Sequence, residues 1–176
     1  MSCVKTRRLF AALWPADPVR FALSATLQAL QLPVGARRVP QTEWHITVAF
    51  LGIVPEPLRA TIEGLLTEFP VQPEPVVLDS LEWWSESRVG VWAASHVPPA
   101  LAAAQADLCW KLSDLGLRVD SRTWRPHLTL ARAMDTPWAA PSLPSFQWPI
   151  RSVALVESQA AVGSGRYTPL MAHELI

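Results

Sequence analysis

The chain has 176 residues, of which 50% are hydrophobic, and this size and composition suit one compact globular domain. Its 15 basic and 15 acidic residues balance to a formal charge of zero, which argues against a protein that coats long nucleic acid through its overall field. No apolar run approaches the ~18 residues that a membrane span needs, no leader-like segment is found, and the two cysteines lack paired spacing, so we expect a reduced, cytoplasmic protein without a membrane partner.

The first half of the chain alternates between expected strands and helices. Apolar residues at alternating or helical spacing define each element, and proline or glycine marks its ends. We expect a strand over Arg8–Trp14, a helix over Pro18–Leu30 with Asp17 as its N-cap, a strand over Trp44–Leu51 that Gly52 ends, and a helix over Pro55–Phe69. A proline-rich stretch over 70–75 predicts the connection to the second half.

The second half begins with an expected hairpin and ends with two more strands. The signals are alternating apolar residues around short polar or glycine-rich turns. We expect hairpin strands over Val76–Trp84 and Arg88–Ser95, a helix over Pro98–Leu115 that ends at Gly116, a strand over Pro126–Arg132, a proline-rich loop over 137–149, and closing strands over Ile150–Ser158 and Tyr167–Leu175 around a turn at 163–165.

Two of these segments, WHITVAFLG (44–52) and PHLTLAR (126–132), carry the same pattern of His, apolar, Thr, apolar. Successive side chains of a strand point to opposite faces, so each segment predicts one buried face and one polar face. The buried faces consist of Trp44, Ile46, Val48 and Phe50, and of Leu128 and Leu130; the polar faces consist of His45 and Thr47, and of His127 and Thr129. The second histidine follows the first by 82 residues (127 minus 45).

The duplicated motif and the order of elements indicate two similar α+β halves. A pseudo-twofold relation between them would bring both histidines to one cleft. Cleavage of a phosphodiester needs a base and an acid on opposite sides of phosphorus, and imidazole serves either role near neutral pH. A threonine hydroxyl can bind a phosphate oxygen, and an arginine can neutralise its charge. This scheme requires no metal, and the usual ligand spacings are absent.

For other polar residues the sequence gives weaker evidence of a functional role. A single His-x-Thr is weak evidence, because both residues fit a half-exposed strand, so it is the duplication that favours function. His96 and His173 lack the motif, and we expect them to be surface or packing residues. Asp79, Glu82 and Glu86 flank the expected hairpin, and we expect them to form a solvated surface.

The chain resembles the RNA 2',3'-cyclic phosphodiesterases of the LigT/ThpR type, which belong to the two-histidine (2H) phosphoesterase superfamily. The resemblance lies in RLFAALWP, HITVAFLG, SRVGVW, RPHLTLAR and GSGRYTPL, which together span nearly the whole chain. It implies a single 2H phosphoesterase domain over residues 1–176 with a bilobal α+β fold, in which two pseudo-symmetric antiparallel sheets carry helices on the outside and enclose a cleft. It also implies an enzyme, a hydrolase that converts 2',3'-cyclic phosphate ends of RNA to 2'-phosphates without a metal or cofactor, and a reversible 2'-5' RNA ligase activity in some members.

The resemblance also assigns roles by motif position. The catalytic acid–base pair is His45, which donates to the departing O3', and His127, which activates water; the substrate-binding residues are Thr47, Thr129 and Arg132. In a regular strand Arg132 falls on the core side, in phase with Leu130, so its role requires that the strand ends or bulges by Ala131.

The expected partners are RNA or oligonucleotide ends that carry a 2',3'-cyclic phosphate, and we expect a monomer. Two alternatives stay open. One is a 2H phosphoesterase that acts on a small cyclic phosphate or on a 2'-5' linkage, and the other is a non-catalytic module that binds RNA ends. The presence of both histidines and both threonines argues against the second alternative.

Overall fold

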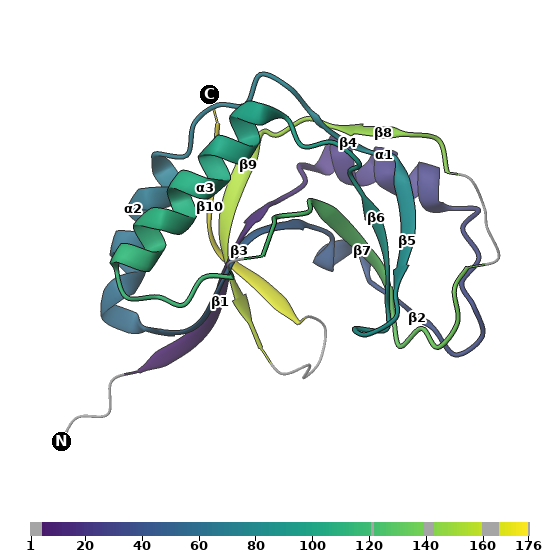
Figure 1. Ribbon diagram of the computed structural model, residues 1–176, viewed down its shortest axis with the longest axis horizontal. Coiled ribbons are helices and arrows are strands. Elements are labelled where there is room, and N and C mark those ends of the chain that lie inside the picture. The colour runs from purple at the N-terminus through teal and green to yellow at the C-terminus, as the bar shows by residue number, and fades with distance from the viewer. Residues whose placement is uncertain (1–4, 121, 139–142, 160–165, 176) are drawn as a thin grey trace.

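The computed structural model describes residues 5–120, 122–138, 143–159 and 166–175. Its strands form a curved sheet, with helices α2 and α3 on one side and α1 on the other (Figure 1). The strands are β1 (Thr6–Leu13), β2 (Arg37–Arg38), β3 (Ile46–Pro55), β4 (Val76–Leu78), β5 (Ser80–Trp84), β6 (Val89–Ala93), β7 (His127–Arg132), β8 (Phe146–Trp148), β9 (Ser152–Ser158) and β10 (Tyr167–Glu174). The helices are α1 (Asp17–Leu27), α2 (Arg59–Thr67) and α3 (Pro99–Asp114), with short 3-10 turns at Gln41–Glu43 and Glu56–Leu58.

Within the described residues the main sheet is antiparallel and eight-stranded. Its order is β10-β9-β1-β3-β7-β6-β5, with β2 also paired to β7, while β4 and β8 form a separate two-stranded sheet. The two halves of the main sheet meet where Ile46 of β3 pairs with Leu128 of β7. The predicted α+β class with antiparallel sheets is confirmed, and the two expected sheets are joined at this central pair.

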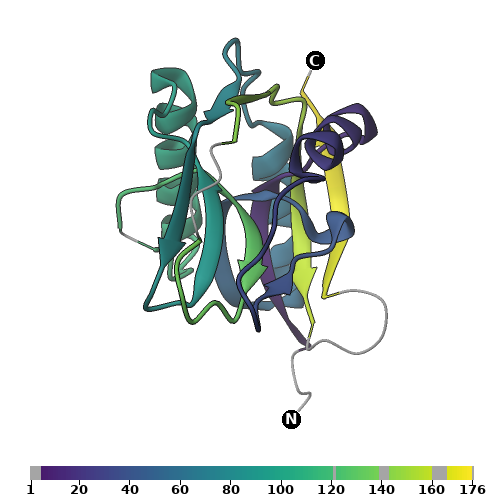
Figure 2. The same ribbon diagram turned by 90° about the vertical axis from the view of Figure 1, so that its right-hand side faces the viewer.

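The spacing between the two motifs recurs in the starts of two helices. Helix α1 begins at Asp17 and α3 at Pro99, an offset of 82 residues (99 minus 17) that equals the offset of the two histidines (127 minus 45). Helix α3 packs against β3, and α2 packs against β9 and α3. Helix α1 lies over the opposite face, in front of the sheet in Figure 2. No helix in the described part of the chain has the length and apolar character needed to cross a membrane.

Each motif strand contains a β-bulge at the same position. Ala12 pairs with Thr47 and Ala11 with Ala49, so Val48 is an extra residue in β3. In β7, Val91 pairs with Thr129 and Gly90 with Ala131, so Leu130 is extra in the same way. A bulge changes which face the following side chains occupy, because two residues oppose one on the partner strand.

The bulge in β3 overturns the predicted burial of Phe50. Val48 and Ala49 are both buried, and Phe50 is 56% exposed, because the alternation changes phase at Val48. The predicted end of the strand at Gly52 is also wrong. Gly52 has a φ of +69°, which glycine adopts without strain, and β3 continues through it to Pro55. The helix expected over Pro55–Phe69 is therefore shorter, over Arg59–Thr67.

Three further expectations are corrected. The N-cap of α1 is Ala16, and Asp17 lies in the first turn, where its charge favours the helix dipole. The strand expected over Val76–Trp84 is divided at Asp79 between the two sheets, because β4 pairs with β8 and β5 pairs with β6. Strand β8 itself lies inside the stretch expected to be a loop, held by Trp148, which is 1% exposed. The turn at 163–165 and residues 139–142 lie outside the described residues.

Gly90, which pairs with Ala131 next to the bulge in β7, is a closely packed position. A Cβ at this position would overlap the Trp138 ring and the Met134 sulfur, whereas a Cβ at Gly64 of α2 would meet nothing within 4 Å. We expect Gly90→Ala to lower the free energy of unfolding by about 1–3 kcal/mol through overpacking. Gly64→Ala is the matched control and should raise it by about 0.5–1 kcal/mol, because alanine favours the helix. Urea denaturation of both variants measures the difference; equal midpoints would contradict the prediction.

Candidate active site

The four motif side chains lie together on one face at the junction of the lobes. Because Ile46 pairs with Leu128 in antiparallel register, His45 lies opposite Thr129, and Thr47 lies opposite His127. All four are partly exposed, whereas Ile46 and Leu128 are fully buried. The alternation predicted from the sequence therefore holds at the centre of both motifs and brings the two polar faces together.

Both histidines are anchored in the same way. The Nδ1 atom of His45 lies 2.6 Å from the carbonyl oxygen of Glu43, and the Nδ1 atom of His127 lies 2.7 Å from the carbonyl oxygen of Arg125. A carbonyl oxygen only accepts a hydrogen bond, so Nδ1 carries the proton in each neutral ring. Nε2 is then the atom of each ring that takes up or releases a proton.

His45 is enclosed by aromatic rings. Its ring centre lies 4.9 Å from that of Phe10 and 5.1 Å from that of Tyr167, and it stacks on Trp14 at 5.8 Å. Burial lowers the pKa of His45 from 6.5 to about 4; the carbonyl of Glu43 opposes this shift, and the charges of Arg132 and His127 add to it. The ring is therefore neutral at pH 7 in the free protein.

His127 has a more polar environment. The centres of the Trp84 and His127 rings lie 4.5 Å apart, and the Arg125 guanidinium lies over the Trp84 ring, 5.5 Å from its centre. Glu82 accepts hydrogen bonds from Trp84 Nε1 at 2.7 Å and from Arg125 at 2.7 Å. Burial lowers the pKa of His127; the carbonyl of Arg125 and the Glu82 charge oppose this shift, and the Arg125 charge adds to it.

Glu82 corrects the expectation of a solvated hairpin surface. Strand β5 brings its carboxylate to the residues that surround His127, where it is held by Trp84 and Arg125. The sequence carries no signal for this, because the contact joins positions 43 residues apart and depends on how the hairpin lies beside β7.

Arg132 reaches the histidine face because of the bulge in β7. Leu130 and Ala131 are both buried, so the alternation changes phase, and Arg132 is partly exposed. Its guanidinium donates a hydrogen bond of 3.1 Å to the Tyr167 hydroxyl, and its charge acts on His45. The irregularity that the sequence required for Arg132 is therefore present, one residue earlier than Ala131, while its role at a phosphate stays a prediction.

A cleft of about 680 Å³ opens beside His127. It is lined by Thr47 and Phe50 of β3, by Trp84 of the hairpin, and by Trp124 and Arg125 of the segment before β7. Trp124 donates a hydrogen bond to the Thr47 carbonyl oxygen at 2.8 Å, which fixes one wall. Within the described residues, no group of three or more His, Cys, Asp or Glu side chains is arranged to hold a metal ion.

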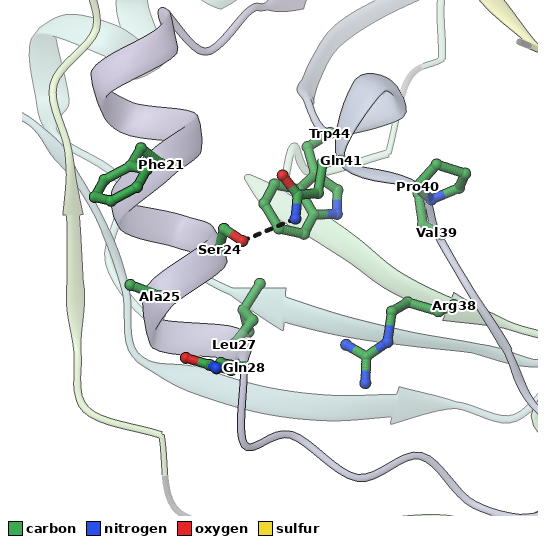
Figure 3. A pocket seen from close by; sticks show the side chains of 10 residues that line it. All are labelled: Phe21, Ser24, Ala25, Leu27, Gln28, Arg38, Val39, Pro40, Gln41 and Trp44. Atoms are coloured by element: carbon green, nitrogen blue, oxygen red, sulfur yellow. Dashed lines mark hydrogen bonds between the residues drawn. The ribbon is translucent and has the colours of Figure 1, made fainter.

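A second hollow, of about 620 Å³, lies between α1 and the segment 38–44 (Figure 3). Trp44 forms part of its wall, and Gln41 donates a hydrogen bond to Ser24 across it, as the dashed line shows. Neither histidine lines this hollow, so it is separate from the candidate active site.

Fold and site define a class of protein: two-lobed α+β proteins with one His-x-Thr strand from each lobe at a shared face. The model of the 2'-5' RNA ligase superfamily matches residues 19–161, and the chain belongs to this family. The RNA 2',3'-cyclic phosphodiesterase of Escherichia coli is 30% identical over 141 residues, which cover 78% of this chain and 79% of the relative. The RNA 2',3'-cyclic phosphodiesterase of Thermus thermophilus is 27% identical over 184 aligned positions, which cover 93% of this chain and 87% of the relative. The crystal structure of E. coli LigT complexed with 3'-AMP superposes with a TM-score of 0.83 at 25% identity, covering 97% of this chain and 99% of that one.

The lowered pKa of His45 predicts a specific pH dependence of stability. Between pH 6.5 and about 4 the unfolded chain binds a proton at this residue and the folded chain does not, so stability falls as the pH drops through this window. The loss from this group is at most about 3 kcal/mol. We expect His45→Gln to reduce the loss of unfolding free energy between pH 7 and 4.5 in urea titrations. The control is His96→Gln at an exposed site, and its unfolding free energy should depend on pH as steeply as that of the wild type. An unchanged pH dependence of the unfolding free energy in His45→Gln would refute the prediction.

The contacts of Glu82 predict that its charge supports protonation of His127. We expect Glu82→Gln to lower the pKa of His127 further, because the Arg125 charge then acts without its carboxylate partner. NMR titration of the His127 ring protons measures this pKa. Glu86→Gln is the control. It removes a charge from the lining of the same cleft, at a side chain with no hydrogen bond to Arg125 or Trp84 in the described residues, and it should leave the pKa of His127 unchanged. A pKa that rises in Glu82→Gln would disprove the assignment.

Proposed function

We propose that the protein is a metal-independent RNA 2',3'-cyclic phosphodiesterase that hydrolyses the cyclic phosphate to a 2'-phosphate. The observation that carries the proposal is the pair of histidines on facing strands, each with its Nδ1 proton held by a backbone carbonyl and a threonine two residues along. The names of the E. coli and T. thermophilus relatives support the same substrate.

In the proposed reaction the cyclic phosphate lies between the two Nε2 atoms. His127 removes a proton from water as the water attacks phosphorus, and His45 donates a proton to O3' as the P–O3' bond breaks. One ring must therefore be protonated and the other neutral. Burial keeps the His45 ring neutral in the free protein and lowers the pKa of His127, and the negative charge of a bound phosphate favours uptake of the proton that the acid needs.

Thr47, Thr129 and Arg132 are proposed to stabilise the charge on phosphate. The threonines share the face of the histidines, and their hydroxyls are of a type that donates to a non-bridging oxygen. The Arg132 guanidinium lies near His45 and is held by the Tyr167 hydroxyl, so its charge is fixed close to the reacting group.

The test is product analysis on an RNA that ends in a 2',3'-cyclic phosphate, with EDTA present. We expect the wild-type protein to form only the 2'-phosphate, and His45→Ala and His127→Ala each to lower kcat by about 10²–10⁴-fold, because each removes one proton-transfer group. His173→Ala, at a histidine outside the motifs, serves as the control. Full activity in either motif variant, or loss of wild-type activity in EDTA, would reject the mechanism.

A further inference from the structure

We propose that the hollow between α1 and the segment 38–44 is a binding site for a small organic acid, a ligand with an apolar body and one carboxylate. Neither motif histidine lines this hollow, and it lies apart from the cleft beside His127. The site therefore does not rest on the proposed function, and its test requires no catalysis.

A hydrogen-bond donor without an acceptor is the first support. The indole Nε1 of Trp44 is buried and has no hydrogen-bond partner in the described part of the chain, and the residue is 3% exposed. Figure 3 shows this nitrogen on the side of the ring toward Pro40 and Arg38, which line the same hollow. A buried donor that lacks an acceptor costs free energy, and a ligand oxygen in the hollow would remove that cost.

A second nitrogen of this kind has a different setting. Trp92 Nε1 is also buried without a partner in the described residues, but Trp92 is fully buried in the core, and its ring centre lies 5.9 Å from that of Phe146. It lines neither of the two hollows described above. Trp44 thus combines a missing acceptor with an adjoining space that can hold one.

The charge of the walls is the second support. Arg38 lines the hollow, and its guanidinium points toward Leu27 in Figure 3. It donates to the Leu30 carbonyl at 2.5 Å and has no carboxylate partner among the described residues, which also place no Asp or Glu in the lining. A carboxylate accepts at both of its oxygens and carries the charge that a guanidinium favours. An indole N–H and an arginine in one hollow therefore favour an organic acid.

The other walls fit an apolar body. Leu27 and Val39 are buried, Pro40 lies beside them in the lining, and Phe21 of α1 is 78% exposed. The volume of about 620 Å³ falls in the range of sites for small organic ligands, which combine apolar walls with a few placed polar groups. The hollow therefore has both the room and the surface for a ring system.

Hydrogen bonds hold the two walls in place. Gln41 donates to the Ser24 hydroxyl at 2.8 Å, and the Arg20 guanidinium donates to the Gln41 carbonyl, so the segment is tied to α1. The Val39 amide donates to the Leu130 carbonyl at 2.9 Å, which ties the same segment to β7. A ligand would meet walls that are already fixed, and its affinity would not be reduced by the cost of ordering them.

The experiment uses naphthalene-1-acetate as the probe and nitrogen–proton correlation NMR of the indole groups as the measurement. We expect the Trp44 Nε1–H signal, identified by its absence in Trp44→Phe, to move as the acid is added, with a Kd of roughly 1 mM or below. Naphthalene-1-acetamide has the same body without the charge. It should bind at least about 5-fold more weakly, because hydrogen bonds to a charged group are stronger.

Ser24→Phe fills the hollow from α1 and should abolish binding of the acid. Ser24 is half-buried and faces Gln41 in Figure 3, so the substitution removes one exposed hydrogen bond and leaves the core intact. Ser113→Phe is the matched control. It adds the same ring at an exposed position of α3, outside the hollow, and should bind the acid as the wild type does.

Trp44→Phe isolates the contribution of the indole N–H. It keeps an aromatic ring in the wall, and calorimetric titration should show a Kd for the acid that is at least about 10-fold higher, because one hydrogen bond to the carboxylate is lost. Trp110→Phe removes an indole that is 68% exposed on α3, outside the hollow, and should leave the Kd unchanged. Circular dichroism reports that each variant is folded.

Three results would overturn the site. A Trp44 signal that stays in place at millimolar acid would show that the hollow takes no such ligand. Equal affinity for the acid and the amide would reject the carboxylate as the recognised group. Wild-type affinity in Ser24→Phe would place the acid elsewhere on the protein. Each of these results leaves the proposed hydrolysis of cyclic phosphates intact.

Discussion

The pairing of β3 with β7 at Ile46 and Leu128 is the constraint on which the site depends. Both side chains are fully buried, so they join the cores of the two lobes, and within the described residues Ile46–Leu128 is the pairing recorded between β3 and β7. This contact sets the residues that flank Ile46 opposite those that flank Leu128, and so both motifs share one face.

The two bulges use this junction in the same way. Each follows the threonine of its motif and turns the next exposed side chain onto the histidine face, Phe50 in one lobe and Arg132 in the other. The two motif strands thus share one backbone irregularity, and the side chains around them differ. His45 lies among Phe10, Trp14 and Tyr167, whereas His127 lies beside a carboxylate-bound arginine and tryptophan. The two imidazoles therefore have unlike surroundings, although burial lowers the pKa of both.

The sequence predicts the parts of this arrangement that depend on local spacing. His45, Thr47, His127 and Thr129 share a face because alternation is regular over three residues, and α3 is expected because apolar residues recur at helical spacing up to Gly116. The sequence places Phe50 on the buried face because a bulge leaves no pattern of its own, and it assigns Glu82 to a solvated surface because its contact with Arg125 is tertiary. Strand β8 has no sequence signal, because a strand of three residues between prolines is too short to show a periodicity.

Strand β1 lies between β3 and β9, so its two neighbours come from the first third and the last part of the chain. Leu9 pairs with Gly52 on one side and with Glu157 on the other. During synthesis, the N-terminal lobe therefore keeps one edge of its central strand open until Ser152–Ser158 has left the ribosome. Pairings of such high sequence separation form slowly, and an open apolar strand is prone to aggregation. The order of synthesis thus makes the last strands of this chain the step that completes its first lobe.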